Sequence, residues 1–270
     1  MHDTDASAAA TFADRYQSVL VPVIFEPWAE EMVRRADPQP GEHILDLACG
    51  TGVVTRRLLA QAVRPGRLAA VDHSADMLAV AGRLSPAAEP PVEWIEADAA
   101  RLPFADDSFD LALCQQALQF FPDRAAALSD LHRVLKPTGR AIFCVQRDLA
   151  VNPMLAAQAS ALETCVGPEA GAAVRAICGL PQADVLQRLF AAAGFRDIRI
   201  DSVSLTLSHP NARAFAAGAM GGMHTGDKLS GLSETRIEQA IEAFLAALGP
   251  CYDGTAMTFP HVSHVVEARA

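Results

Sequence analysis

Short apolar stretches alternate with amphipathic stretches along the first half of the chain. The apolar stretches have the length of buried strands, and the amphipathic stretches have the spacing of helices with one apolar face. Ser74 and Asp123 are residues that cap the first turn of a helix, and they predict helices over 74–84 and 123–135. The alternation predicts an α/β fold with a parallel sheet and helices on both faces. The stretches that predict strands are 43–48, 66–71, 92–96, 109–114 and 140–146.

The second half of the chain follows a different pattern. Residues 197–207 and 257–268 have the pattern of two long strands, with helix-compatible segments inserted between them. The inserted regions 152–181 and 209–230 are candidates for a cap. Glycines disfavour a rigid packed helix throughout 209–230, because each lowers helix stability by up to about 1 kcal/mol relative to alanine. We therefore expect region 209–230 to form a mobile lid.

The most informative turn follows the first predicted strand, in the sequence HILDLACGTG over 43–52. An open α/β sheet binds ligands beyond the carboxyl ends of its strands, where this turn lies. Gly50 and Gly52 have no Cβ, which permits a tight turn and a close approach of the backbone to a ligand. Asp46 brings a carboxylate that attracts a cation, and Ala48 lies two residues further on, in the turn. The turn fits S-adenosylmethionine, whose amino group and sulfonium are both positive.

A dinucleotide site is the main alternative for this turn. Its fingerprint requires a third glycine or an alanine, and Thr55 stands at that position. An acid before the first glycine is also unfavourable beside a pyrophosphate. The turn therefore favours S-adenosylmethionine over NAD.

These residues resemble the class I S-adenosylmethionine-dependent methyltransferases, in particular the methyltransferase type 11 branch that includes ubiquinone and menaquinone biosynthesis enzymes. The resemblance runs from 42 to 146 with specific motifs, among them RLPF at 101–104 and DSFD at 107–110, and more loosely to the C-terminus. It implies a Rossmann-like, seven-stranded, mostly parallel sheet with an antiparallel last strand and a helical cap. The expected parts of this single domain are an N-terminal helical segment over the active site (1–40), the cofactor-binding core (41–146) and the rest of the sheet with the cap insertions (147–270).

Two further strand ends extend the predicted cofactor site. Asp72, followed by His73, lies 22 residues after Gly50 and can accept hydrogen bonds from both hydroxyls of a ribose. Met77 is placed to pack on an adenine face, although simple core packing explains it nearly as well. Asp98 and the backbone of Ala99 can together bind the edge of an adenine.

The end of the fourth strand completes the predicted site. The resemblance implies that this loop lies beneath the methionine part of the cofactor and borders the substrate, with the Cys114 carbonyl accepting from the cofactor's ammonium group. Gln115 and Gln119 can orient a substrate. Many relatives carry a histidine where Gln119 stands, and an amide cannot take a proton. Tyr16 contacts the cofactor's carboxylate if it acts as a tyrosine in this region does in similar enzymes, or it serves only in packing.

One histidine of the chain is a candidate general base. His224 lies in the glycine-rich segment of the expected lid and titrates near neutral pH. His261 and His264 fall on the last strand pattern and are interpreted as structural or exposed. The histidines and acids have no metal-ligand spacing, so we expect no metal. His224 and Gln119 are the candidate catalytic residues.

The composition of the chain limits the kinds of molecule that it is expected to bind. The net charge of −10, from 22 basic and 32 acidic residues, disfavours non-specific binding to nucleic acid. No apolar run has the length of a membrane span, and six scattered cysteines suggest a reducing cytoplasm. We expect a cytoplasmic methyltransferase, monomeric or homodimeric, that methylates a small and apolar molecule by in-line transfer. A cofactor-binding regulatory protein without catalysis and an RNA-modifying enzyme remain alternatives.

Overall fold

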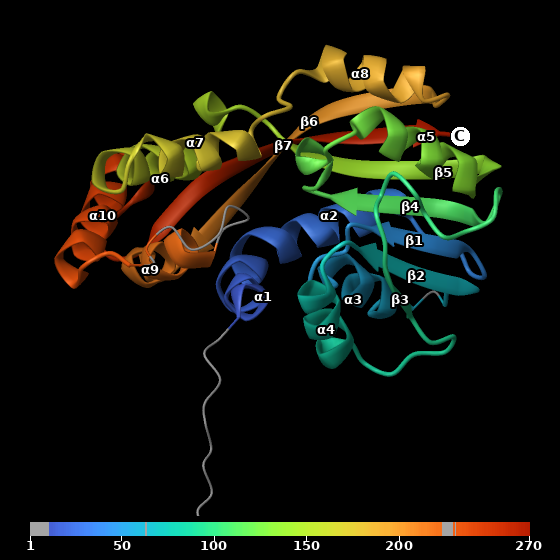
Figure 1. The fold of residues 1–270 in the computed structure, drawn as a ribbon, viewed down its shortest axis with the longest axis horizontal. Coiled ribbons are helices and arrows are strands. Elements are labelled where there is room, and N and C mark those ends of the chain that lie inside the picture. The colour runs from blue at the N-terminus through green and yellow to red at the C-terminus, as the bar shows by residue number, and fades with distance from the viewer. Residues whose placement is uncertain (1–10, 63, 223–228, 230) are drawn as a thin grey trace, which may run out of the picture.

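The computed structural model describes residues 11–62, 64–222, 229 and 231–270. Seven strands form one sheet in the order β3-β2-β1-β4-β5-β7-β6 (Figure 1). The strands are β1 His43–Leu47, β2 Arg67–Asp72, β3 Glu93–Glu96, β4 Phe109–Gln115, β5 Leu135–Gln146, β6 Arg196–His209 and β7 Met257–Arg269. Neighbours are parallel from β3 to β5, whereas β7 is antiparallel to both β5 and β6. The predicted Rossmann-like sheet with an antiparallel last strand is confirmed.

Helices cover both faces of the sheet and divide the apolar core into two clusters. On one face lie α2 Glu26–Ala36, α3 Val53–Leu59 and α4 Ala75–Leu84. On the other face lie α5 Arg124–Val134 and α8 Ala183–Ala192. The predicted caps are present, because the side chains of Ser74 and Asp123 accept hydrogen bonds from backbone amides in the first turns of α4 and α5.

Some predicted boundaries differ from the structure. The helix expected to reach Leu135 ends at Val134, and β5 begins at once with Leu135 instead of at Arg140. The predicted stop over 136–139 is therefore part of a strand. Phe109 pairs with Leu135 before the register shifts to Leu111 opposite Arg140. This irregularity accommodates the Pro-Thr-Gly sequence that otherwise indicates a turn.

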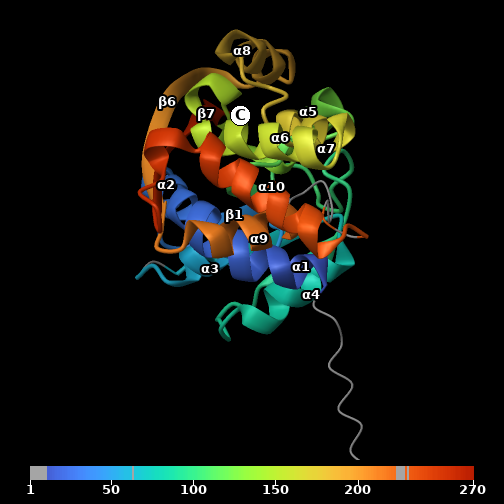
Figure 2. The ribbon, with the colours of Figure 1, turned by 90° about the vertical axis from the view of Figure 1, so that its left-hand side faces the viewer.

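Strands β6 and β7 continue past the carboxyl end of β5 (Figure 1) and support a helical cap, which faces the viewer in Figure 2. The cap helices are α6 Pro153–Cys165, α7 Pro168–Ile177, α9 Ala212–Gly222 and α10 Glu234–Ala247. The N-terminal segment, with α1 Phe12–Arg15 and the π-helix η1 Tyr16–Phe25, lies beside α9. The N-terminal segment and the cap helices therefore lie around the carboxyl edge of the sheet.

The region 209–230, in which glycines disfavour a packed helix throughout, contains a packed helix over residues 212–222. Helix α9 buries Phe215, Ala219 and Met220. A Cβ on Gly218 would lie 2.7 Å from a methyl carbon of Val19, so the glycine lets α9 approach η1 closely. Close packing on η1 therefore offsets the low helix propensity of this glycine. Residues 223–228, which include His224, lie outside the described part of the chain.

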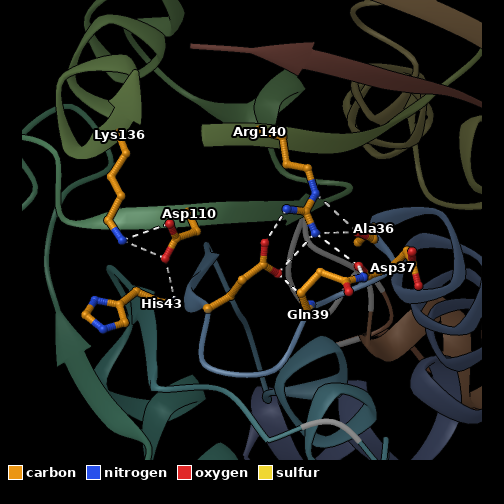
Figure 3. A network of polar contacts seen from close by, with 8 residues as sticks. Ala36, Asp37, Gln39, His43, Asp110, Lys136 and Arg140 are labelled. Atoms are coloured by element: carbon orange, nitrogen blue, oxygen red, sulfur yellow. Dashed lines mark hydrogen bonds and ion pairs between the residues drawn. The ribbon is translucent and has the colours of Figure 1, made fainter. Parts of the chain in front are cut away.

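A polar network fixes the amino edge of the sheet (Figure 3). Asp110 accepts a hydrogen bond from the backbone of His43 and forms an ion pair of 2.8 Å with Lys136. Arg140 pairs with Glu42 and donates to the carbonyls of Ala36 and Asp37. These contacts join the starts of β1, β4 and β5 to the end of α2, at the edge opposite to the predicted cofactor site.

Candidate functional site

The turn after β1 has the backbone conformation of a ligand-binding loop. Ala48, Gly50 and Gly52 all have left-handed backbone angles, with φ of 55°, 55° and 80°. A Cβ built on Gly50 meets no atom within 4 Å, whereas one on Gly52 would lie 3.0 Å from Trp94 and Ala81. Gly52 is thus required by close packing, and Gly50 leaves open space above the turn. This is the arrangement that we predicted for close approach of a ligand to the backbone.

Asp46 is buried at the end of β1, with 1% of its surface exposed. One carboxylate oxygen accepts hydrogen bonds from the backbone amide and the hydroxyl of Thr55, at 2.9 and 2.6 Å. The pKa of Asp46 is raised to about 7, mainly by burial; the hydrogen bonds from Thr55 oppose this rise, and the nearby negative charge of Asp72 adds to it. A bound cation at this place would favour the ionised carboxylate.

Asp72 is the second buried acid of the site, at the end of β2. Its oxygens accept from the backbone amides of Gly50 at 2.8 Å and Ser74 at 2.9 Å. A carboxylate oxygen can accept more than one hydrogen bond, so both keep capacity for further donors. The side chain of His73 is exposed, and its Nδ1 lies 3.5 Å from Asp72.

The predicted partners for the cofactor's two ends come from η1, from α4 and from the loop after β3. Tyr16 is buried in η1, and its hydroxyl is close enough for Asp72 to contribute to the raised pKa of the tyrosine, after the larger effect of burial. Met77 is buried in the first turn of α4. Asp98, which follows β3, is exposed and accepts from the amide of Ala100 at 2.9 Å, and Ala99 is half-buried next to it.

The end of β4 brings three glutamines to the carboxyl edge. Cys114 is fully buried, and Gln115 donates to the carbonyl of Phe25 at 2.7 Å. Gln116 has a φ of 55°, which is unusual for a residue other than glycine and is common at functional sites. Its side chain donates to Ser263 of β7 at 2.8 Å. Gln119 lies in the short helix η2 Leu118–Phe120.

Gln119 holds an unused hydrogen-bond acceptor. Only 4% of its surface is exposed, and its amide nitrogen donates to the carbonyl of Gln116 at 3.2 Å. A carbonyl can only accept, so this contact fixes which end of the Gln119 amide is nitrogen. The Oε1 of Gln119 is buried and has no partner in the described structure. Arg124 holds η2 in place by donating to the carbonyls of Leu118 and Gln119.

A small cavity lies at these glutamines, with a volume of about 30 Å³. Its lining is apolar apart from four polar side chains, and the N-terminal segment forms one wall. Such a volume holds about one water molecule, so a larger ligand requires the lining to move. The residues that line it are Leu20, Ile24, Phe25, Gln116, Gln119, Phe120, Gln146, Leu155, Ile177 and His261.

His261 is a member of this cavity that the sequence interpretation missed. We interpreted it as structural or exposed, but only 3% of its surface is exposed, and it lies at the cavity wall. The indole nitrogen of Trp28 donates to His261 Nδ1 at 2.8 Å. The two residues are far apart in the sequence, and neither strand alternation nor helix spacing indicates that they meet.

The observed groups fit S-adenosylmethionine. The pair of buried acids, Asp46 and Asp72, favours a cation over a pyrophosphate at the turn. Two buried polar atoms without described partners, Thr51 Oγ1 and Gln115 Oε1, lie in the turn after β1 and at the end of β4. The described residues contain no group of three or more side chains arranged to hold a metal ion.

Comparisons with known proteins agree with this geometry. Residues 45–143 match a family described as methyltransferase domain. A 2-phytyl-1,4-naphtoquinone methyltransferase of Nostoc sp. is 35% identical over 116 residues, which are 42% of this chain and 51% of that protein. A demethylmenaquinone methyltransferase of Staphylococcus epidermidis is 28% identical over 70% of this chain and 82% of its own length. The chain thus matches about half the length of the first of these relatives.

Solved structures show the same fold. A phosphoethanolamine N-methyltransferase 2 of Haemonchus contortus, in complex with S-adenosylhomocysteine, has a TM-score of 0.60 at 17% identity. The match covers 98% of this chain and 59% of that one. Residues 45–143 thus match a methyltransferase domain, and the fold is that of the class I S-adenosylmethionine-dependent methyltransferases, as the sequence predicted. No helix in the described part of the chain combines the length and apolar character needed to span a membrane.

Proposed function

We propose that this protein transfers a methyl group from S-adenosylmethionine to a small, largely apolar molecule. The observation that carries the proposal is the open turn at Gly50, bounded by the buried carboxylates of Asp46 and Asp72. It supports a cationic ligand that lies close to the backbone. The small cavity behind the neighbouring end of β4 supports a second, apolar ligand beside the first.

The residues after β1, β2 and β3 would hold the cofactor. Asp72 would accept from the ribose hydroxyls, and Asp98 with the Ala99 amide would bind the adenine edge, beside Met77 and His73. The turn containing Ala48, Gly50 and Gly52 would surround the methionine end. Tyr16, the Cys114 carbonyl and Gln115 would contact the amino-acid group, because they border the same edge from η1 and β4.

When bound, S-adenosylmethionine supplies a methyl group on a sulfonium sulfur, and it leaves as S-adenosylhomocysteine after the S–CH₃ bond breaks. The acceptor atom provides the electron pair of the new bond. The cavity lining contributes no carboxylate, and an amide such as Gln119 cannot take a proton. The chain therefore contributes position and exclusion of water more than proton transfer. The acceptor either enters already ionised or loses its proton after the transfer.

The substrate class is proposed from the cavity and from the relatives. An apolar lining with a few polar groups favours a flat ring system that carries oxygen atoms. The curated relatives are named for naphthoquinones and menaquinone, which have this character. Since the cavity is small, we propose that η1 moves outward when the substrate enters. His224 remains a candidate base, although it lies outside the described residues.

Methyl transfer is tested with tritium-labelled S-adenosylmethionine and reduced 2-alkyl-1,4-naphthoquinone, without oxygen. We expect label in the extracted naphthoquinol, and a loss of this label when Asp72 is changed to alanine. The matched control is Asp184→Ala, because Asp184 is an exposed acid on α8. Binding of S-adenosylmethionine without transfer to this acceptor or to a panel of phenols and amines would instead favour a regulatory cofactor-binding protein. Transfer to RNA alone would overturn the small-molecule proposal.

A further inference from the structure

The lining of the small cavity includes His261, and a second buried residue, Trp28, sets which nitrogen of the His261 ring can donate a hydrogen bond. Trp28 of α2 is fully buried and donates its indole N–H to His261 Nδ1. An indole nitrogen can only donate, so Nδ1 must be the acceptor and must carry no proton. The neutral imidazole then holds its proton on Nε2.

The charge state of His261 follows from the same surroundings. Burial lowers the pKa of His261 to about 4, so the ring is neutral at ordinary pH. Its Nδ1 is occupied by Trp28, and no described residue accepts a hydrogen bond from its Nε2. His261 is therefore a donor and not a base.

The backbone beside His261 is fixed from two sides. Asn152 donates to the carbonyl of Val262 at 3.1 Å and accepts from its amide at 2.8 Å. Gln146 donates to the same carbonyl at 2.9 Å. His261 itself pairs with Leu205 of β6. The donor is consequently held by the sheet and by α2.

The same cavity offers an acceptor, the buried Oε1 of Gln119, which has no described partner. We infer that His261 recognises the substrate by donating a hydrogen bond from Nε2–H to an oxygen of the methyl acceptor. Trp28 positions His261 for this role by holding its Nδ1. Gln119 Oε1 accepts from a second polar group of the same molecule. The inference rests on the proposed function and assigns the acceptor molecule one accepting oxygen and one donating group, as in a hydroxyl-bearing aromatic ring.

Three substitutions and a control separate recognition from folding. His261→Asn places an amide oxygen near the position of Nδ1, so it retains an acceptor for Trp28 but removes the donor toward the cavity. His261→Gln carries its amide nitrogen further and restores part of the donor. Trp28→Phe keeps an aromatic ring at this position but removes the indole N–H that constrains the tautomer. His264→Gln is the matched control, because His264 lies on the same strand and bonds the carbonyl of Pro181 instead.

The first measurement is the protonation state and tautomer of the His261 imidazole, observed by nitrogen NMR in the complex with S-adenosylhomocysteine. We expect the Nε2–H tautomer in the unmodified protein and a mixture of tautomers in Trp28→Phe. Addition of 1,4-dihydroxynaphthalene, without oxygen, should shift the Nε2 resonance. A wild-type imidazole that is charged or protonated on Nδ1 would overturn the inference, as would a resonance unchanged at saturation.

The second readout is the affinity and turnover of the same probe. We expect His261→Asn to lower kcat/KM at least about tenfold, since a buried hydrogen bond to a polar group is lost, with partial recovery in His261→Gln. Affinity for S-adenosylhomocysteine should stay unchanged in both. Equal kcat/KM in His261→Asn and wild type would contradict the role of His261. If the probe does not bind although S-adenosylhomocysteine does, this inference fails and the cofactor site stands.

Discussion

Replacing Asp46 with asparagine should make the free protein more stable, and increasingly so as the pH rises toward neutrality. The ordinary pKa of an aspartate is 3.8, and that of Asp46 is raised to about 7 by burial. The unfolded chain therefore ionises this carboxyl at a lower pH than the folded chain. Between these two values the stability of the wild-type protein falls as the pH increases, and above about 7 the loss is complete.

The magnitude follows from the two pKa values. Each tenfold difference in acidity corresponds to about 1.4 kcal/mol, so the full loss is on the order of 4 kcal/mol. Asparagine is neutral and of similar shape, and its oxygen can accept both hydrogen bonds from Thr55. Asp46→Asn should thus match the wild type near pH 4 and exceed it by up to about 4 kcal/mol at pH 8.

Urea unfolding across this pH range measures the difference. Asp184→Asn is the control, and it should show no gain that grows toward alkaline pH, because the hydrogen bond from Arg188 lowers the pKa of this exposed acid. The same Asp46→Asn variant should bind S-adenosylhomocysteine and S-adenosylmethionine more weakly than the wild type at pH 8. A stability difference that is constant from pH 4 to 8 would show that Asp46 is ionised normally in the free protein, contrary to its described burial.

Four further predictions test other parts of the molecule. Asp72→Ala and Asp98→Ala should each weaken S-adenosylmethionine binding by about 1–3 kcal/mol in calorimetry, without unfolding the protein; unchanged titrations would remove them from the site. Activity on an identified acceptor should survive a strong chelator, and loss with rescue by magnesium would point to a metal-dependent mechanism. Amides 215–220 of α9 should exchange slowly in the free protein because this helix packs on η1, whereas fast exchange would restore the lid that the glycines suggested. His261 resists protonation when folded, so the free energy of unfolding should fall as the pH drops from 6.5 to about 4, and His261→Asn should lack this fall in acid titrations.

The fold was predictable because its main signals are local. Each strand of the first half is a short apolar stretch, and Ser74 and Asp123 form the caps that the sequence indicates. The turn at Gly50 and Gly52 is likewise a local pattern, since left-handed angles favour glycine. These signals place Asp46, Asp72 and Asp98 at one edge of the sheet without knowledge of distant contacts.

The small cavity at Gln119 and His261 depends on contacts between distant parts of the chain, and it could not be predicted in the same way. Trp28 and His261 are separated by 233 positions and meet only because β7 passes beyond the end of β5. Gln119 was predicted to orient a substrate, but its free acceptor is visible only once Gln116 occupies the other end of the amide. Helix α9 forms despite its glycines because Gly218 allows contact with Val19, which no local propensity records.

A crystal structure with S-adenosylhomocysteine tests the central claim most directly. We expect the ligand at the carboxyl edge of the sheet, over the turn at Gly50, with its ribose at Asp72 and its adenine beside Asp98. A larger cavity, of about 430 Å³, lies at the opposite edge and is lined by charged residues such as Arg140 and Arg269. Density for the ligand in that cavity, or at the Gly50 turn for NAD but not for S-adenosylhomocysteine, would contradict the assignment.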